Sequence, residues 1–575
     1  MESTTNHLNE KGVSLTVTQS APSLPDPEAR PACFTSTVQE ALFVLVVTMS
    51  IAMASFLAGT VTVISTFVGK GLGMTTAEIV WMSSAASLAG GAFLLFFGKL
   101  ADVCGRKLLL LVSLFCFSSF ALGSAATKTA ITLDVLNGFM GLATACTVPA
   151  ALGTLGAIYE KPSKRKNYAF ACLSAGNPIG FVFGTIFSGV AANIGGPRAS
   201  LTVLSIIYFA VTLTAFFIVP NDSAVKQKLT WETLKQFDPV GVLLTIFGIG
   251  MFCVALSSTD NAPQGWRTPY ILVLLILGLV TIIAFVVWET YTTYPLIPMS
   301  ILRDRNLSLI LGTIVLGSMS FPVTTIFLAM FFQSVWGMST LSTAVHLLPM
   351  AITSIIVNGF AAMMLHRVSN RLLMMCGVCA YALSLVLFAL NRQTDTYWSF
   401  CFVGLVVAII GTDLQFNVAN MYVMSSMPRA QQSVAGSILQ TVGKLSQSVG
   451  YGIGTAVFNA VLANPSLGSY YAKDKVTQPY AAVFWFAAAC AGVSLVLVWF
   501  LTIGTQGNHE KTEDEHRDGD VTVVHDVDSE EKVNGMGEET LTKKGFEVDV
   551  QEESAVKKDG SEKGKVQDPI WIGED

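Results

Sequence analysis

Charged residues are scarce in this sequence. Asp, Glu, Lys and Arg make up 13% of its 575 residues, whereas about 25% is usual in soluble proteins. Hydrophobic residues make up 52%, and the mean hydropathy is +0.58. This composition excludes an ordinary soluble globular protein and predicts a membrane protein.

The sequence also lacks the motifs of common catalytic and nucleotide sites. It contains no GxxxxGK[ST] phosphate loop, and the pair Gly443-Lys444 lies inside an apolar run. It has no HExxH, no GxSxG and no convergent Cys/His set. Most of the ten cysteines lie in apolar runs, and Cys376-x-x-Cys379 has no second pair nearby. We therefore expect no enzyme, no ATP-driven pump, no metal or cofactor and no nucleic-acid partner.

The two ends of the chain differ from its middle. Residues 1–39 are polar and proline-rich, without the apolar core of a cleavable signal. Residues 505–575 carry 21 acidic and 9 basic side chains. Such segments bury too little apolar surface to offset the entropy of ordering them. We expect a disordered cytosolic segment at 1–39 and an acidic disordered cytosolic tail at 505–575.

Fourteen long apolar runs fill the middle of the chain, and each is long enough to cross a bilayer as a helix. An even number of spans places both termini on one side of the membrane. The short loops on that side carry about 15 Lys and Arg against about 7 on the other side, which predicts that the termini are cytosolic. The runs are 41–67, 78–98, 108–127, 131–157, 168–192, 199–219, 239–258, 269–290, 307–333, 343–365, 372–391, 397–424, 431–462 and 480–504.

The stretch GKLADVCGRK, residues 98–107, lies between the second and third runs and holds four charges. Asp102 and Arg106 are four residues apart, and Gly98 and Gly105 permit a tight turn. A topology signal explains Arg106 and Lys107 but leaves Asp102 and both glycines unexplained. A conformational latch between helices explains more of the stretch.

These residues resemble the signature GxLaDrxGrkxxl of the major facilitator superfamily. The resemblance implies an all-α membrane protein that transports solutes by alternating access. It also implies that this turn makes a charge-relay contact with the other half and stabilises the outward-facing state.

A second motif lies in the fifth apolar run. Gly176, Pro178, Gly180 and Gly184 form GxPxGxxxG. Small residues four apart allow helices to approach closely, and a proline removes one backbone hydrogen bond. The pattern resembles the antiporter-type motif of drug exporters in this superfamily.

The number of runs and three further segments indicate which group within the superfamily the sequence resembles. TVPAALGTLGAIY (147–159), RKNYAFACLSAGNPIG (165–180) and the helix pair that begins near FDPVG (237–241) resemble the fourteen-helix drug:proton antiporters, in particular the fungal aminotriazole-resistance-type branch. This implies a major facilitator fold with 14 transmembrane helices: a six-helix bundle at 40–220, two inserted helices at 221–306 and a second six-helix bundle at 307–504. The substrate cavity is then expected between the bundles.

Two charges familiar in such exporters are absent. Asn137 stands where the fourth helix usually carries a buried arginine in RxxxG, and the first run contains no aspartate. We expect Asn137 to belong to the coupling site or to the substrate cavity. Proton antiport therefore does not follow from the resemblance alone.

Asp413 and Lys444 are an acid and a base deep inside adjacent apolar runs, roughly 17 and 20 Å from the cytosolic helix ends. Ionisable groups at such depth are candidates for function. The two residues serve proton coupling or substrate contact, or they form a structural ion pair. Gln415, Asn417 and Gln440 lie near them and are expected either to hydrate a cavity wall or to bond neighbouring helices.

The sequence thus predicts a secondary transporter that exports small organic molecules by proton antiport, with the lipid bilayer, protons and a small-molecule substrate as its partners. Export of borate, aminotriazole or a similar solute is the alternative, and a non-transporting sensor is less supported. A facilitated uptake carrier is opposed by the GxPxGxxxG stretch. We expect a monomer in the plasma membrane, with the vacuolar membrane as the alternative. The sequence does not specify the substrate.

Overall fold

The computed structural model describes residues 30–503, except for 32, 160–163, 221–237, 258–261, 263–264, 293–303, 365–366 and 426–431. The expected N-terminal segment up to residue 29 and the acidic tail therefore lie outside the described residues, as does most of the linker after the first six helices.

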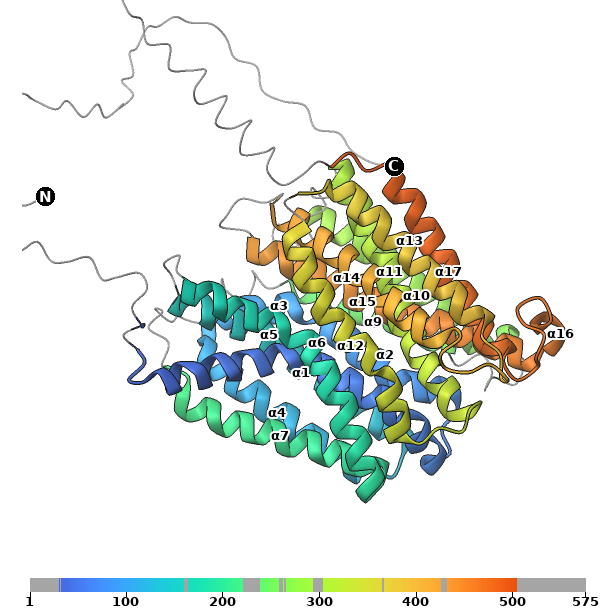
Figure 1. The fold of residues 1–575 in the computed structure, drawn as a ribbon, viewed down its shortest axis with the longest axis horizontal. Coiled ribbons are helices and arrows are strands. Elements are labelled where there is room, and N and C mark those ends of the chain that lie inside the picture. The colour runs from blue at the N-terminus through green and yellow to red at the C-terminus, as the bar shows by residue number, and fades with distance from the viewer. Residues whose placement is uncertain are drawn as a thin grey trace, which may run out of the picture. The chain divides into compact units, whose positions relative to one another are not determined.

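Helices make up nearly all of the described chain, so the all-α expectation is confirmed (Figure 1). The long helices are α1 (Thr37–Leu72), α2 (Thr76–Ala92), α3 (Leu94–Cys104), α4 (Arg106–Ala126), α5 (Ala130–Ile158), α6 (Lys164–Gly195), α7 (Pro197–Ile218), α9 (Pro239–Ser257), α10 (Pro269–Tyr291), α11 (Arg305–Ser334), α12 (Thr340–Met364), α13 (Asn370–Leu390), α14 (Cys401–Ser425), α15 (Gln432–Ala463) and α17 (Gln478–Trp499). Two short elements, η1 (Gly265–Arg267) and α16 (Pro465–Gly468), lie in the connections.

In the part of the chain that the structure describes, each of the fourteen apolar runs is mainly helical, but only twelve of the described helices are long and apolar enough to count as membrane spans by themselves. The second run is divided between α2 and α3, and α15 is too polar. The helix α15 packs against α2, α9, α11, α14 and α17. Protein surrounds it instead of lipid, so its polar residues are tolerated.

The expected turn at residues 98–107 is shorter than the sequence indicated. Helix α3 continues to Cys104, so Gly98 is helical and is not a turn residue. Gly105 alone separates α3 from α4, with φ 95° and ψ 132°, a conformation that favours glycine. Arg106 and Lys107 begin α4. A single glycine therefore makes the turn.

The first half of the chain is built around the contact between α1 and α6. Gly176, Gly180 and Gly184 form a row along α6, which we call the glycine row, and each faces the backbone of α1. A Cβ atom added to Gly180 would lie 2.5 Å from the carbonyl oxygen of Ala52. Only glycine permits this approach, so the motif brings two helix backbones into direct contact.

The second half repeats this arrangement with α11 and α15. Gly450 faces the backbone of Met319, and a Cβ atom on Gly454 would lie 2.5 Å from Cγ1 of Val323. The spacing of four residues on both helices matches that of the glycine row. Corresponding helix pairs in the two halves are therefore packed in the same way.

The two halves meet along two seams, α2 against α15 and α6 against α12. In the first seam, the hydroxyl groups of Ser84 and Ser448 lie 2.9 Å apart, and Ser87 donates to Oε1 of Gln447 over 3.2 Å. Helix α9 covers this seam, since it packs on both α2 and α15. Few helices thus hold the two halves together, and α9 lies over one of the seams.

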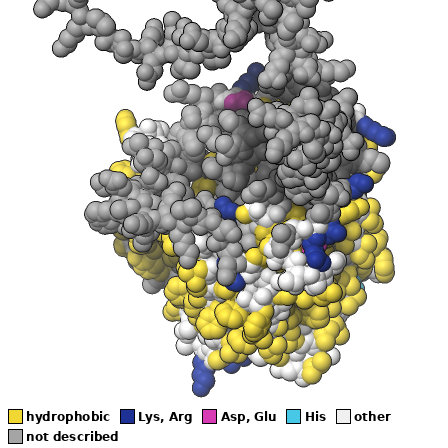
Figure 2. All heavy atoms as spheres, turned by 90° about the vertical axis from the view of Figure 1, so that its left-hand side faces the viewer, with side chains coloured by type: hydrophobic (Ala, Val, Ile, Leu, Met, Phe, Trp, Pro, Cys, Tyr) yellow, Lys and Arg dark blue, Asp and Glu magenta, His cyan; other side chains and the backbone are white. Residues whose placement is uncertain are grey.

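We call the side on which α1 begins and α17 ends the terminus side. Figure 2 views the molecule from the side on which α1 begins and shows Lys and Arg side chains there, with hydrophobic side chains over much of the remaining described surface. Arg106, Lys107, Lys164, Arg165 and Lys166 all lie at helix ends on this side.

Candidate functional site

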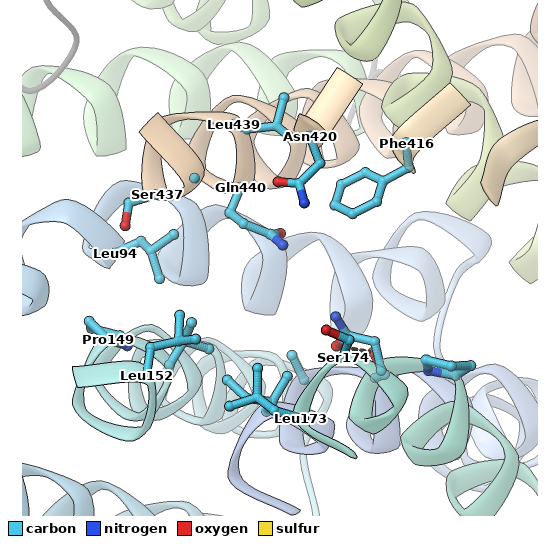
Figure 3. A pocket seen from close by; sticks show the side chains of 18 of the residues that line it. Leu94, Pro149, Leu152, Leu173, Ser174, Phe416, Asn420, Ser437, Leu439 and Gln440 are labelled. Atoms are coloured by element: carbon cyan, nitrogen blue, oxygen red, sulfur yellow. Dashed lines mark hydrogen bonds between the residues drawn. The ribbon is translucent and has the colours of Figure 1, made fainter. Parts of the chain in front are cut away.

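A large cavity lies between the two halves. Its volume is about 1850 Å³, whereas typical ligand pockets have roughly 300–1,000 Å³. Figure 3 shows its two walls: Pro149, Leu152, Leu173 and Ser174 of the first half lie opposite Phe416, Asn420, Ser437, Leu439 and Gln440 of the second half, and Leu94 of the first half lies beside Ser437. The walls are mainly apolar with interspersed amides and hydroxyls.

The cavity reaches the terminus side and is closed at the opposite end. Gly98, Arg106 and Ser437, all near terminus-side helix ends, belong to its lining. At the other end, Nε2 of Gln333 in α11 donates to the carbonyl oxygen of Val63 in α1 over 2.7 Å. Side chains of α2 also pack there in one hydrophobic cluster with α11, α12, α13, α14, α15 and α17. We call this closed end the seal.

Asp413 lines the cavity from α14 and is held by neutral donors. Its Oδ2 accepts a hydrogen bond from the Ser354 hydroxyl over 2.5 Å and one from Nδ2 of Asn358 over 2.9 Å. Asn417 donates in turn to Oδ1 of Asn358 over 2.8 Å. The carboxyl group is thus fixed against α12 by a short polar chain.

Lys444 also lines the cavity, but it points elsewhere. Its Nζ lies 3.4 Å from the position that a Cβ atom would take on Gly90 of α2. Among the described residues, no ion pair joins Asp413 and Lys444. The interpretation of these residues as a structural ion pair is therefore wrong for this conformation, because each side chain faces a different neighbouring helix.

The other polar residues predicted near this pair have separate roles. Gln415 is 3% exposed and its Nε2 donates to the carbonyl oxygen of Thr313 over 2.8 Å, so it ties α14 to α11. Asn417 belongs to the chain that reaches Asp413, and Gln440 projects into the cavity (Figure 3). All three line the cavity.

Sequence reasoning missed several polar residues of the cavity wall. Ser354 and Asn358 in α12 provide the donors to Asp413, and Ser55 in α1 donates to Oδ1 of Asn177 in α6 over 3.1 Å. Their signal was available as isolated polar residues at helical spacing inside apolar runs.

Asn137 lies away from the cavity. It is 0% exposed within α5, and its Nδ2 donates to the carbonyl oxygen of Leu133 over 2.9 Å. It is absent from the described residues that line the cavity. Asn137, which occupies the position of the usual arginine, therefore bonds within α5 of the first half and does not face the cavity.

The predicted latch residues lie at the cavity mouth. Nη1 of Arg106 donates to the carbonyl oxygen of Gly153 in α5 over 2.9 Å, a contact within the first half. Gly98 and Lys107 line the mouth, whereas the side chain of Asp102 lies outside the described residues. The latch therefore stays a prediction.

The antiporter-type motif on α6 presents two different faces. Its glycine row contacts α1, whereas Pro178, next to Asn177, lines the cavity. The same turns of α6 therefore fix the first half internally and form part of the cavity wall.

An ionic cluster around a buried glutamate joins three helix ends on the terminus side. Glu40 in α1 is 7% exposed and accepts hydrogen bonds from Arg165 over 2.6 Å and from the Tyr159 hydroxyl over 2.8 Å. Burial and the bond to Glu40 raise the pKa of Tyr159 above its usual range. This cluster holds the ends of α1, α5 and α6 together, and the sequence alone gave no indication of it.

Comparison with protein families agrees with this architecture. The model of the Major Facilitator Superfamily matches residues 42–451 and 351–544. The chain belongs to this superfamily of transporters. Solved structures show the same fold: a nucleoside transporter, NupG, superposes with a TM-score of 0.58 at 12% identity over 80% of this chain and 99% of that one. A peptide transporter, POT, in complex with sulfate gives 0.58 at 16% identity over 80% and 94%.

Three curated relatives from fungi are similar to the chain over most of its length. The chain is 27% identical to a low affinity ammonium transporter of Saccharomyces cerevisiae, over 68% of this chain and 76% of the relative. It is 26% identical to the efflux pump terJ of Aspergillus terreus, over 81% and 88%. It is 24% identical to the aminotriazole resistance protein of Saccharomyces cerevisiae, over 86% and 91%. The resemblance to the fungal aminotriazole-resistance-type branch is thus confirmed.

Proposed function

We propose that this transporter exports small organic molecules by proton antiport. The observation that carries the proposal is the position of Asp413, a carboxyl group on the wall of a cavity that opens on the terminus side. A proton can drive a transport cycle only through a group whose proton affinity differs between the two facing states. Asp413 meets this requirement if its contacts with Ser354 and Asn358 change as the halves move.

The cavity walls favour organic substrates of mixed polarity. Leu94, Leu173 and Phe416 offer apolar surface, and Ser174 and Gln440 offer hydrogen bonds between them (Figure 3). Apolar walls with a few polar groups are typical of sites for small organic ligands. The efflux pumps among the relatives support export as the direction.

Export of a small polar solute is the second candidate. The similarity to the aminotriazole resistance protein favours aminotriazole or a comparable solute, with borate as the other option. Because one relative is named as an ammonium transporter, ammonium is another small polar solute to consider as the substrate. The cation Lys444 in the cavity disfavours ammonium, since like charges repel.

The proposal includes an orientation and a location. The basic residues on the terminus side support a cytosolic position for both termini, so that the cavity faces the cytosol. We place the protein in the plasma membrane as a monomer.

The test is transport by the purified full chain in liposomes, with and without a pH gradient, against a panel of toxins, azoles, aminotriazole, borate and ammonium. Asp413→Asn keeps the shape of the side chain but cannot exchange a proton. We expect this variant to lose gradient-driven export and to retain substrate exchange at zero gradient. Asp395→Asn, the same change in the loop between α13 and α14, is the matched control and should export normally.

Gradient-driven export at the wild-type rate by Asp413→Asn would remove Asp413 as the coupling residue. Export that is equally fast without a pH gradient in the wild type would refute proton antiport itself. The panel decides between the two substrate classes.

A further inference from the structure

The ammonium group of Lys444 reaches the cavity without meeting an acceptor. Lys444 lies in α15 and belongs to the lining of the cavity. Among the residues that the structure describes, none accepts a hydrogen bond from its Nζ or forms an ion pair with it. The side chain is only partly buried, and Nζ is not among the atoms that are enclosed without a partner. The charge is therefore open to a molecule that occupies the cavity.

In the described part of the chain, no acidic side chain neutralises this charge. Of the helices that pack on α15, α9 and α17 contain no charged residue. Glu78 lies in the first turn of α2, where it accepts from Thr75, and Asp102 stands at the terminus-side end of α3. Asp413 of α14 faces α12, and Asp413 and Lys444 do not act electrostatically on each other. The cation is thus left for a ligand to pair with.

Three polar side chains flank Lys444 on the same face of α15. Ser437 and Gln440 precede it by seven and four residues, and Gln447 follows it by three, a spacing that places all of them on one side of a helix. All three line the cavity, and Gln440 projects into it (Figure 3). Oε1 of Gln447 accepts from Ser87 over 3.2 Å, so its amide nitrogen remains as a donor. We call Ser437, Gln440 and Gln447 the polar stripe. It surrounds the cation with hydrogen-bond donors and adds no acid.

We propose that Lys444 and the polar stripe bind a carboxylate group, so that the substrate is an organic anion with an apolar body. An ammonium group and amide N–H groups are donors that a carboxylate accepts, and bonds between charged partners are the stronger ones. The apolar side chains of the cavity, such as Leu173 and Phe416, then contact the body of the molecule. The proposal rests on export of organic molecules through this cavity as the proposed function, and it names their class.

An anionic substrate is compatible with proton antiport. Because Asp413 and Lys444 do not act on each other, an anion paired with Lys444 leaves Asp413 available for a proton. A membrane potential acts on every charge that crosses the bilayer. When the cytosol is negative, an anion that leaves and a proton that enters both move in the favoured direction. Export of an anion and entry of a proton are therefore driven by the same potential.

The test compares three probes that share one ring system and differ in charge. At about pH 7, naphthoate is an anion, naphthamide is neutral and naphthylmethylammonium is a cation. Their binding to the full chain in lipid nanodiscs is measured by equilibrium dialysis, with empty nanodiscs as the correction for partition into lipid. In the wild type, we expect naphthoate to bind at least about tenfold more tightly than naphthamide, and the cation to bind most weakly.

Two variants of the lysine separate its charge from its packing. In Lys444→Met, which keeps the length of the side chain, we expect the affinity for naphthoate to fall by about tenfold and that for naphthamide to stay within about twofold. Lys444→Arg keeps the charge and should retain the preference for the anion. Lys473→Met, the same change at an exposed position in the loop before α17, is the matched control and should bind all three probes as the wild type does.

Equal affinities of the wild type for naphthoate and naphthamide would overturn the site, and this comparison decides even if a variant does not fold. Naphthoate binding that is unchanged in Lys444→Met would also overturn it. Equal losses of both probes in that variant would assign Lys444 to packing and would equally reject the proposal. Binding requires neither a pH gradient nor transport, so failure of this site and failure of proton antiport are distinguishable.

Discussion

At the scale of single residues, the cavity separates two opposite charges that the sequence places at similar depth. Asp413 is held by Ser354 and Asn358, and Lys444 faces Gly90 across the seam. Removal of one partner of a buried ion pair is strongly destabilising because it leaves an unpaired charge. Here neither residue depends on the other.

Substitution of Lys444 should therefore be tolerated by the fold. We expect Lys444→Met to reach the membrane in wild-type amount and to unfold within a few degrees of the wild type, since a cation without an anionic partner is removed. Thermal unfolding in detergent, monitored by fluorescence, checks this expectation. A loss of folded protein that Asp413→Asn restores would reveal an ion pair in another conformation.

The sequence predicts how deep Asp413 and Lys444 lie in the membrane, but it does not predict the direction in which each side chain points. Counting residues along a helix gives the height of a side chain, whereas its rotation depends on which neighbour each helix face meets. The partners Ser354 and Asn358 lie about 60 residues before Asp413 in the chain, so only the fold brings them together.

At the scale of helices, the antiporter-type motif serves mainly to pack α6 against α1. The glycine row brings the backbone of α6 onto that of α1, and Gly450 and Gly454 do the same for α15 and α11. Sequence spacing predicted close approach but could not name the partner helix. Nor could it predict the separation of α2 and α3 at Phe93, which follows adjacent Gly90 and Gly91.

A large side chain in the glycine row should separate these two helices. We expect Gly180→Leu to lower the free energy of unfolding by at least about 2 kcal/mol, because the backbone of Ala52 cannot move away cheaply. Unfolding by denaturant in mixed micelles measures the loss. Gly492→Leu is the control, since Gly492 of α17 is exposed with open space around it. Equal stability of both variants would contradict the packing role.

At the scale of the whole described bundle, two halves enclose a cavity that is open on one side only. Alternating access requires the α2 and α15 seam to part at the seal side. The family and the general fold could be predicted from motifs and from the number of apolar runs. The conformation could not, because both facing states are built from the same sequence.

A cross-link over the seam should stop transport. We expect Ser84→Cys with Ser448→Cys to form a disulfide, since the two hydroxyl oxygens lie 2.9 Å apart. A Cys253→Ser background prevents exchange with the nearby thiol. Oxidation should abolish export and reduction should restore it. The matching pair Ser118→Cys with Ser205→Cys lies within the first half, 3.4 Å apart, and should leave export unchanged. Full export by the oxidised seam variant would exclude movement of this seam.

The acidic tail should be dispensable for transport itself. Deletion of residues 515–575 removes a segment with few apolar side chains, which has little to contribute to a packed bundle. We expect unchanged export in liposomes, measured beside the full chain at equal protein amount. A truncated protein that inserts but does not export would make the tail part of the transport mechanism.

The contacts of the glycine row and of Gly450 also determine when each half can close during synthesis. Ala52 and Gly180 touch through their backbones but are 128 residues apart in the chain, and Met319 and Gly450 are separated by a similar interval. At about 5–20 residues per second, a ribosome needs roughly 6–26 s to bridge the first interval. During that time α1 has been synthesised, but the glycine row of α6, against which it packs, has not. Each half can thus close only when its fifth helix has emerged, and the first half completes this step before the second begins.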